Sequence, residues 1–329
     1  MYISKIWLFF LLLFVSTISK SQSTDYSIKF EGIADNREFF SNLDMPETIF
    51  GSRLAFSLGT TVDSIHHVRA GLSYFYEFGS TLNHNLPSLL LYYQVEKNNL
   101  SFIMGAFPRK ENLCLPFAFV AEKYEYYHPV IEGLLLKYQT DQTKLQVFAD
   151  WLSKQDLLSR EQFMAGFIGQ QRISNFFAEA YTYLFHKAYQ LVRPENQYIE
   201  DNMGVAFLIG YDFSEILPLS VLNMKTGLLS SAYRNRGNGL DFDIKNSWYS
   251  ELNAEYKGFG LSALIKIGNR HQFLMGDSFY NNTKNYARTN FYFTPINFER
   301  VKGRFIYSLH FSDIRVDHQQ QFSLVYFFN

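Results

Sequence analysis

The chain has 329 residues, of which 30 are Lys or Arg and 31 are Asp or Glu, so its formal net charge is −1. This balance excludes a nucleic-acid partner held by a basic surface, because such proteins carry a clustered excess of positive charge. Phe and Tyr dominate an aromatic content of 18%, and the single cysteine, Cys114, cannot form an internal disulfide.

The first residues have the layout of a secretory signal peptide. Lys5 is followed by an apolar run, residues 6–15, and then by small and polar residues, 16–23. The apolar run is shorter than the roughly 20 residues that a transmembrane helix needs. We therefore expect residues 1–22 to be a cleaved signal peptide and residues 23–329 to form one exported domain, with an uncleaved N-terminal anchor as the alternative.

The rest of the chain alternates between apolar and polar side chains, as strands do. In residues 67–78, Leu72 and Tyr76 fall on one face, whereas Arg69 and Glu77 fall on the other. A soluble sandwich also alternates in this way, so the pattern predicts strands without deciding the architecture.

The number and length of the predicted strands are more informative. Each strand has roughly the 9–11 residues that a tilted strand needs to cross a bilayer. We place about sixteen strands near residues 26–37, 48–60, 67–78, 87–96, 99–107, 131–140, 144–152, 161–171, 175–186, 203–212, 220–232, 247–257, 259–268, 286–295, 302–312 and 319–329.

The connections between these strands fall into two classes. From the second strand onward, every other link is mostly short, as in "EKNN", "TDQT" and "KGFG", whereas the links between them are mostly longer. Outer-membrane barrels have an even strand count, short turns on one rim and long loops on the other. The sequence therefore predicts an all-β fold: a transmembrane, antiparallel, up-and-down β-barrel of about 16 strands.

The C-terminal segment "QFSLVYFFN" fits such a barrel, because a last strand that pairs with the first leaves no exposed edge. Phe322, Leu324, Tyr326 and Phe328 would then face lipid and headgroups, where aromatic side chains are common. The segment is also similar to the terminal signature of outer-membrane proteins, which usually ends on the aromatic residue itself. Here Asn329 follows the last aromatic residue.

Several stretches of the first half resemble porin-like outer-membrane barrels of the Bacteroidetes type. They are "GIADNREFF", "ETIFGSRLAFSLGT", "YFYEFGS", "GAFPRKENLCLPFAFVAEKYEYYHPVIEGLLLKY", "FADWLSKQD" and "EQFMAGFIG". The resemblance implies a barrel in the outer membrane of a Gram-negative cell and passive passage of solutes. It brings no catalytic residues with it.

The long link 108–130 is unusually aromatic for a surface loop, so it must pack against something. In sixteen-stranded porins the third long loop folds inward and narrows the pore, and this link is similar to it in position and length. Packed in this way, the link would line a constriction together with charged wall residues. The predicted pore-lining residues are Arg109, Lys110, Glu111, Glu122, Lys123 and Glu125 of the link, with Arg37, Arg53, Arg69 and Glu77 of the wall.

Two alternatives remain open for these groups. The link could cap the barrel or pack over its rim, without touching a channel. The inward-facing acidic and basic residues nearly balance, which indicates weak ionic selectivity, and many of them could instead form cross-strand pairs that stiffen the wall.

We predict a porin, a passive diffusion channel for small hydrophilic solutes that is not an enzyme. Its expected partners are outer-membrane lipid and such solutes, with association into homotrimers left open. The first alternative is a non-conducting barrel whose long loops, such as 186–202 and 232–247, bind a partner or a glycan.

After the porin and the non-conducting barrel, the third candidate is an outer-membrane lipid hydrolase that uses His310 and Ser312, two residues apart on one strand face. Outer-membrane phospholipases present such a pair toward lipid, whereas the predicted parity here turns both side chains inward. No metal site is expected, since the adjacent His66 and His67 would point to opposite faces of a strand. No cofactor is expected either, because the sequence contains no nucleotide-binding fingerprint.

Overall fold

The computed structural model describes residues 22–81, 86–313 and 315–328. The predicted signal peptide lies outside the described residues, apart from its last position, Gln22. Within the described ranges, no helix is long and apolar enough to cross a membrane.

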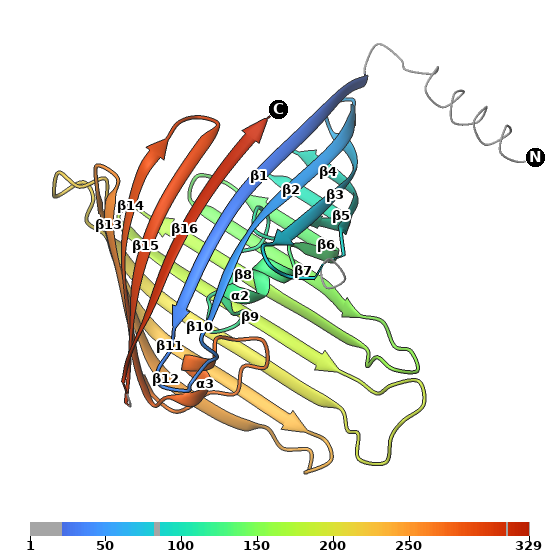
Figure 1. Cartoon of the computed structure of the whole chain (residues 1–329), viewed down its shortest axis with the longest axis vertical. Helices are drawn as coiled ribbons and strands as arrows, with labels where there is room; N and C mark the ends of the chain where they lie inside the picture. Colours follow the sequence, from blue (N-terminus) through green and yellow to red (C-terminus); the bar gives the residue numbers. More distant parts are fainter. Residues whose placement is uncertain (1–21, 82–85, 314, 329) are drawn as a thin grey trace, which may run out of the picture.

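Sixteen strands form one closed antiparallel barrel (Figure 1). They are β1 (Gln22–Glu38), β2 (Glu47–Val62), β3 (His66–Glu77), β4 (Ser88–Lys97), β5 (Leu100–Pro108), β6 (Val130–Gln139), β7 (Thr143–Ser153), β8 (Gln162–Ile173), β9 (Phe176–Lys187), β10 (Glu200–Asp212), β11 (Val221–Asn235), β12 (Asp243–Tyr256), β13 (Phe259–Gly268), β14 (Asn285–Asn297), β15 (Val301–Ser312) and β16 (Val316–Phe328). Two short helices, α2 (Glu122–Tyr127) and α3 (Ser278–Asn282), lie in long connections. The predicted fold class and strand count are confirmed.

Each strand pairs with its neighbours in the sequence, and β16 closes the barrel by pairing with β1. In that pair Phe30 lies opposite Tyr326 and Ile28 lies opposite Phe328. The aromatic C-terminal segment is therefore covered along its edge, which explains how a hydrophobic end of the chain is kept from aggregating.

The alternation in the sequence sets which side chains face outward. Leu54 and Leu72 are each 53% exposed on the outer wall, whereas the next residue along β3, Ser73, is only 5% exposed and faces the lumen. An apolar outer face and a polar inner face is the arrangement of a membrane barrel.

This parity predicts the effect of a charge on the outer wall. Replacing Leu72 with arginine is expected to destabilise the barrel by about 2–4 kcal/mol, the cost of a charge near the bilayer midplane. Gln94→Arg places the same charge on a strand face that points to the lumen and is expected to cost far less. Urea unfolding of both variants in lipid vesicles measures the difference, and equal losses would contradict the outward placement of Leu72.

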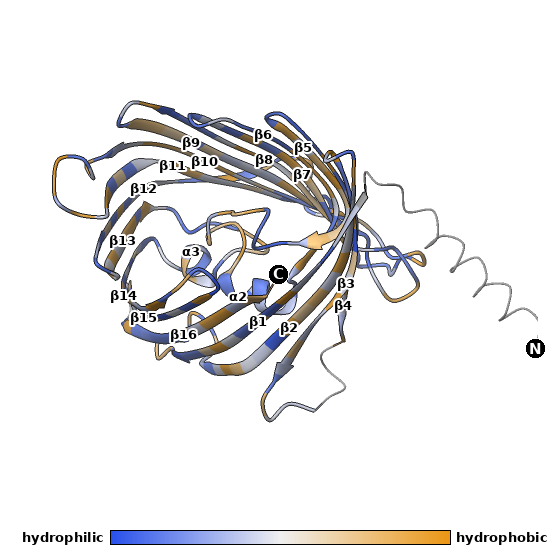
Figure 2. Cartoon of the chain, turned by 90° about the horizontal axis from the view of Figure 1, so that it is seen from above, coloured by the Kyte–Doolittle hydropathy of each residue, from blue (hydrophilic) through white to orange (hydrophobic). Residues whose placement is uncertain are grey.

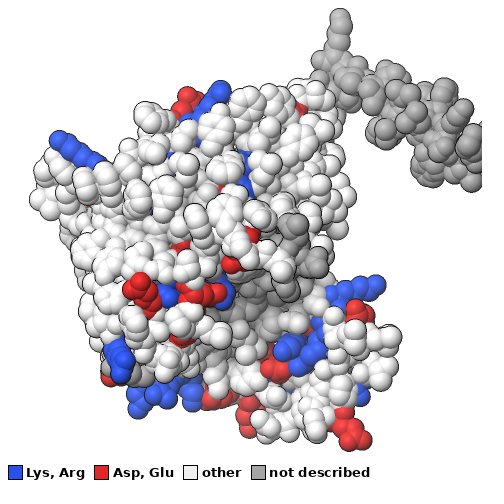
Figure 3. All heavy atoms as spheres, viewed as in Figure 1, with Lys and Arg blue, Asp and Glu red and all other residues white. Residues whose placement is uncertain are grey.

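The two rims differ in their connections. Two-residue turns on one rim have a first residue in the left-handed region, Asn98 (φ 54°), Ser174 (φ 52°) and Lys257 (φ 49°), and the last is followed by Gly258 (φ 83°). Positive φ at these positions matches the twist of tight hairpins. β1 begins and β16 ends on this short-turn rim, and charged side chains gather toward the opposite, long-loop rim, which is lower in Figure 3.

Two of the long connections turn into the barrel. The first inward loop, residues 109–129, contains α2, and the second inward loop, residues 269–284, contains α3. Seen from above, both lie inside the ring of strands (Figure 2). The link 108–130 is thus a lumenal element rather than a cap on the rim.

Candidate functional site

The first inward loop is anchored where it leaves the wall. Arg109 forms an ion pair with Asp150 of β7 and donates to the backbone oxygen of His128 at 2.9 Å. The Nζ atom of Lys137, on β6, donates to Asn112 Oδ1 at 2.6 Å. These bonds fix the start of the loop against β6 and β7.

The same loop then crosses to the opposite wall. Glu111 pairs with Lys29 of β1 at 2.9 Å, and the Glu122 carboxylate accepts from Gln321 of β16 at 2.9 Å. Arg288 of β14 also donates to Glu122, at 3.4 Å. Burial opposes ionisation of Glu122, but the Arg288 guanidinium and the Gln321 amide outweigh it and lower the pKa of the carboxyl.

The second inward loop is held by a buried lysine. Lys266 is fully buried, and its Nζ atom donates to the backbone oxygens of Asn269, Tyr280 and Thr283 at 3.1, 3.1 and 2.6 Å. These three bonds satisfy both the ammonium group and the carbonyls around α3.

Removing this ammonium group is expected to release the second inward loop. Lys266→Met takes one donor from each of three carbonyls and leaves that of Thr283 with no other donor among the described residues, at a cost of roughly 1–3 kcal/mol. The carbonyls of Tyr280 and Asn269 keep the His271 amide and the Ser247 hydroxyl as donors. Amide hydrogen exchange within residues 269–284 should then accelerate while the strands stay protected. Lys284→Met, which removes an exposed lysine from the same loop, serves as the control. Unchanged exchange in Lys266→Met would mean that other contacts hold the loop.

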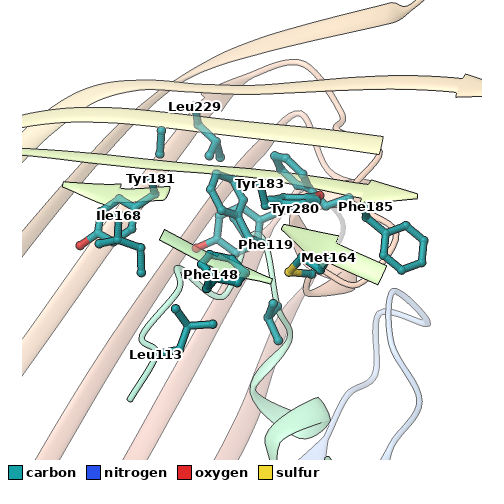
Figure 4. Packing of buried hydrophobic residues seen from close by; sticks show 14 of the residues in the cluster. Leu113, Phe119, Phe148, Met164, Ile168, Tyr181, Tyr183, Phe185, Leu229 and Tyr280 are labelled. Atoms are coloured by element: carbon teal, nitrogen blue, oxygen red, sulfur yellow. The ribbon is translucent and has the colours of Figure 1, made fainter. Parts of the chain in front are cut away.

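The two loops meet and share an apolar core with the wall. The amide of Ala121 donates to the backbone oxygen of Met275 at 2.8 Å. Phe119 packs against Tyr183 of β9 with ring centroids 5.0 Å apart (Figure 4). It also packs against Phe273, with ring centroids 5.3 Å apart. The middle of the lumen beside β6–β12 is therefore filled, and nearer the short-turn rim these strands leave a cavity of about 410 Å³ that Gln170, Glu179 and Lys225 line.

Three cavities follow β1 from one rim toward the other. The inner vestibule, about 600 Å³, is lined by residues near the short-turn rim that include Asp25 and Arg69. The narrow cavity, about 60 Å³, shares Lys29 and Glu111 with the vestibule. The outer cavity, about 160 Å³, lies between the long loops and is lined by Arg37, Phe39, Asp44, Ala121, Glu122, Lys123, Gly276, Asp277, Ser278, His310 and Gln319.

An apolar collar separates the narrow cavity from the outer one. Ile33, Ile49 and Phe75 of the wall form a buried cluster with Tyr126 of α2. The backbone oxygen of Tyr126 accepts from Arg53, and its hydroxyl accepts from Gln321 at 3.2 Å. The collar therefore places one tyrosine ring between two polar spaces.

The outer cavity combines a carboxyl group with nearby cations. Asp277 caps α3, and its Oδ1 atom accepts from the amide of Phe279 at 2.9 Å. Burial raises the pKa of this carboxyl to about 6, although the Phe279 amide acts in the opposite direction. Arg37 forms an ion pair with Asp35 at 2.8 Å, and Lys123 forms one with Glu47. The Oγ atom of Ser278 is buried and has no hydrogen-bond partner among the described residues.

His310 also lines the outer cavity, on the inward face that the sequence predicts. Its Nδ1 atom is 2.8 Å from the hydroxyl of Tyr286, and its Nε2 atom is 3.2 Å from Gln319 Oε1. Ser312 Oγ donates to the backbone oxygen of Arg315 at 2.9 Å. These hydrogen bonds direct the two side chains to different partners, so they do not build the His310–Ser312 pair of the third candidate.

Nine of the ten predicted pore-lining residues line one of the three cavities. Arg53, Arg109, Lys110, Glu111 and Glu125 line the narrow cavity, Arg37, Glu122 and Lys123 line the outer one, and Arg69 lines the vestibule. Glu77 accepts from the hydroxyl of Tyr127. Most of these charges are paired, as in Arg53–Glu31 at 2.9 Å, in agreement with the alternative of cross-strand pairing. Their role in a pore stays a prediction.

The sequence interpretation missed the second inward loop. Asp277 and Ser278 therefore received no role, although the signal was present in Phe273, Phe279 and Tyr280, which give this loop an aromatic content similar to that of residues 108–130. In the described part of the chain, no group of three or more His, Cys, Asp or Glu side chains is placed to hold a metal ion.

The sequence profile of a lipid A 3'-O-deacylase-type family matches residues 17–328, nearly the whole chain. The chain belongs to this deacylase-type family. The prediction that the protein is not an enzyme is therefore wrong, since the family is one of ester hydrolases. No curated protein matches the chain significantly in sequence.

Solved structures similar to this deacylase-type chain are outer-membrane barrels. OpdK of Pseudomonas aeruginosa is 10% identical, with 93% of this chain and 98% of that chain covered and a TM-score of 0.53. A loop L8 deletion mutant of OmpT from Vibrio cholerae is 10% identical, with 94% and 100% covered and a TM-score of 0.56. A triple mutant of the Rhodopseudomonas blastica porin is 13% identical, with 93% and 100% covered and a TM-score of 0.53. At these identities the likeness concerns the fold alone, and it confirms the predicted resemblance to porin-like barrels at that level.

Proposed function

We propose that this protein is an outer-membrane hydrolase that removes an ester-linked acyl chain from a lipid A-type glycolipid. The family match over nearly the whole chain carries the proposal. The outer cavity supports it, because it places a carboxyl group, a hydroxyl group and cationic side chains between the long loops, at the rim where lipid headgroups would lie.

In the proposed reaction the Asp277 carboxylate takes a proton from a water molecule. That water attacks the acyl carbonyl carbon, and the negative charge that develops on the carbonyl oxygen is stabilised by Arg37 or Lys123. The ester C–O bond then breaks, the sugar oxygen receives the proton, and the products are a fatty acid and a glycolipid with a free hydroxyl. Ser278 is the alternative nucleophile, in which case an acyl-enzyme ester forms first and water releases it.

The test is mass spectrometry of a lipid A-type glycolipid incubated with the refolded chain in detergent. We expect the mass to fall by that of one acyl chain, with the free fatty acid appearing in equal amount. A substrate that stays intact with a correctly folded barrel would overturn the proposal.

A second candidate function, passage of small hydrophilic solutes, is favoured by one observation. The inner vestibule, about 600 Å³, adjoins the narrow cavity, about 60 Å³, where the first inward loop crosses the lumen. In this candidate solutes pass from the vestibule through the narrow cavity to the outer cavity, and the collar around Tyr126 closes that route. Conductance across a planar bilayer tests whether solutes pass. Location in the outer membrane, a cleaved leader, a Bacteroidetes-type source and a homotrimer stay predictions in both candidates.

A further inference from the structure

A charged cluster lies on the outside of the barrel, at the long-loop end of β9, β10 and β11. On β10 the exposed side chains Met203, Val205 and Phe207 mark the outward face, and Asp201 continues that face toward the long loops. By the same alternation, Arg234 continues the outward face of β11 that carries Leu228. The cluster thus begins where the apolar outer wall ends.

One carboxylate organises two arginines in this cluster. Asp201 Oδ2 accepts from Arg234 at 3.0 and 2.6 Å and from Arg236 at 2.9 Å, and Asp201 Oδ1 is 2.7 Å from His186 Nδ1. Asp201 is 4% exposed, whereas the Arg236 side chain is 38% exposed. The Nη1 atom of Arg236 makes no hydrogen bond within the described ranges. Each nitrogen of Arg234 is hydrogen-bonded, since its Nη1 atom donates to the backbone oxygen of Leu240 at 3.1 Å. The pair is therefore held in a fixed orientation, and Arg236 supplies the nitrogen that is left without a partner among the described residues.

Aromatic rings mark the membrane boundary directly beside the cluster. Trp151 stacks on Phe163 with ring centroids 5.5 Å apart, and the rings of Phe163 and His186 have centroids 5.2 Å apart. Trp and Tyr belts lie at the level of lipid headgroups. The arginine pair therefore sits at headgroup height, on the face that lipid covers.

In this cluster four basic side chains share two carboxylates. Arg160 and Lys187 share one carboxylate, Glu200, at 2.7 and 3.7 Å, and the arginine pair shares Asp201. The nearby Asp243 is paired with Lys245 at 2.7 Å. The loops that project at the lower right of Figure 3 accordingly present basic side chains next to acidic ones.

We propose that Arg234 and Arg236 form a binding site for the phosphomonoester headgroup of a membrane lipid on the outer wall. A guanidinium group binds phosphate through paired, charge-assisted hydrogen bonds, and the lipid tails would lie along the exposed apolar residues of β10. The site rests on the proposed membrane location but not on hydrolysis, because it lies outside the barrel and apart from the outer cavity.

The experiment measures lipid retention by native mass spectrometry in detergent, with all variants in an Asp277→Asn background so that hydrolysis of the lipid is slowed. The probes are a diphosphorylated lipid A-type glycolipid, its dephosphorylated form and inorganic phosphate. Arg234→Gln/Arg236→Gln is expected to weaken binding of the phosphorylated lipid by about tenfold or more. Arg172→Gln, which removes an exposed arginine paired with Asp212 near the short-turn rim, is expected to change nothing.

A second variant separates binding from folding. Asp201→Asn removes the carboxylate but keeps both arginines, so binding of the phosphorylated lipid should persist. The triple variant Asp201→Asn/Arg234→Gln/Arg236→Gln should lose this binding, and its fold is not burdened by a buried carboxylate that has lost its arginine partners. Equal retention of the dephosphorylated lipid, or full binding by the arginine double variant, would overturn the site. Displacement by millimolar inorganic phosphate alone would show a site for free phosphate and would also overturn it. Failure of acyl release in the wild type would leave these outcomes unaffected.

Discussion

Replacing Asp277 with asparagine is expected to lower the rate of acyl release about a hundredfold or more, which is the usual contribution of a general base. The side chain keeps its shape and can still accept from the Phe279 amide, so α3 should stay capped. Glycolipid mass spectrometry measures the loss. Asp44→Asn, which changes another carboxyl group lining the same cavity, is the matched control and should retain most of the activity.

The assignment of Asp277 as the general base also predicts how the reaction depends on pH. A carboxyl with a pKa of about 6 is mostly protonated below that pH and cannot take a proton from water, so the rate should fall as the pH drops through 6 and level off above it. An ordinary aspartate would lose activity only near pH 4. A profile that is flat between pH 5 and 8, or full activity in Asp277→Asn, would exclude Asp277 as the base. Ser278→Ala distinguishes the two nucleophiles, since only an acyl-enzyme route requires the hydroxyl.

The wall of the barrel could be predicted from the sequence because every strand obeys the same local rule. A side chain such as Leu72 must face lipid and its neighbour Ser73 must not, and a shift by one residue would reverse both. The connections were equally readable, since a tight hairpin needs residues that tolerate positive φ, as at Lys257 and Gly258. Closure by the C-terminal strand follows from the cost of an open edge.

The lumen could not be predicted in this way, because its contacts join residues far apart in the chain. Glu122 meets Arg288 and Gln321, and Ala121 meets Met275, through the path of two loops that no local pattern specifies. Aromatic content indicated that residues 108–130 must pack against something, with the barrel wall and the rim both open, and the same reasoning applies to residues 269–284. The partner of each charged wall residue depends on strand register, so pairs such as Lys225–Glu179 emerge only in the structure.

Replacing Tyr126 with alanine is expected to open the lumen to ions. The ring is 9% exposed and fills the apolar collar with Ile33, Ile49 and Phe75, so its removal joins the narrow cavity to the outer cavity. The cost of roughly 3–5 kcal/mol for a large-to-small change falls on the collar, while the barrel is held by its strand ladder. In planar bilayers the variant should give frequent conductance steps that scale with salt, where the wild type gives rare or none.

Tyr124→Ala is the matched control, because it removes a tyrosine from the same helix whose ring stacks on His128 and lies outside the collar. Phe75→Ala removes the wall side of the collar and should conduct as Tyr126→Ala does.

Equal steps from Tyr124→Ala would mean that loosening the loop anywhere opens the barrel. A folded, heat-resistant Tyr126→Ala barrel that never conducts would place the barrier elsewhere. Frequent steps from the wild type would show a route that bypasses the collar. Conduction only in the collar variants would mean that the barrel encloses a polar route along β1 and that the collar keeps this route shut. A lipid hydrolase that works at the long-loop rim needs such a closed collar if the membrane is to remain sealed.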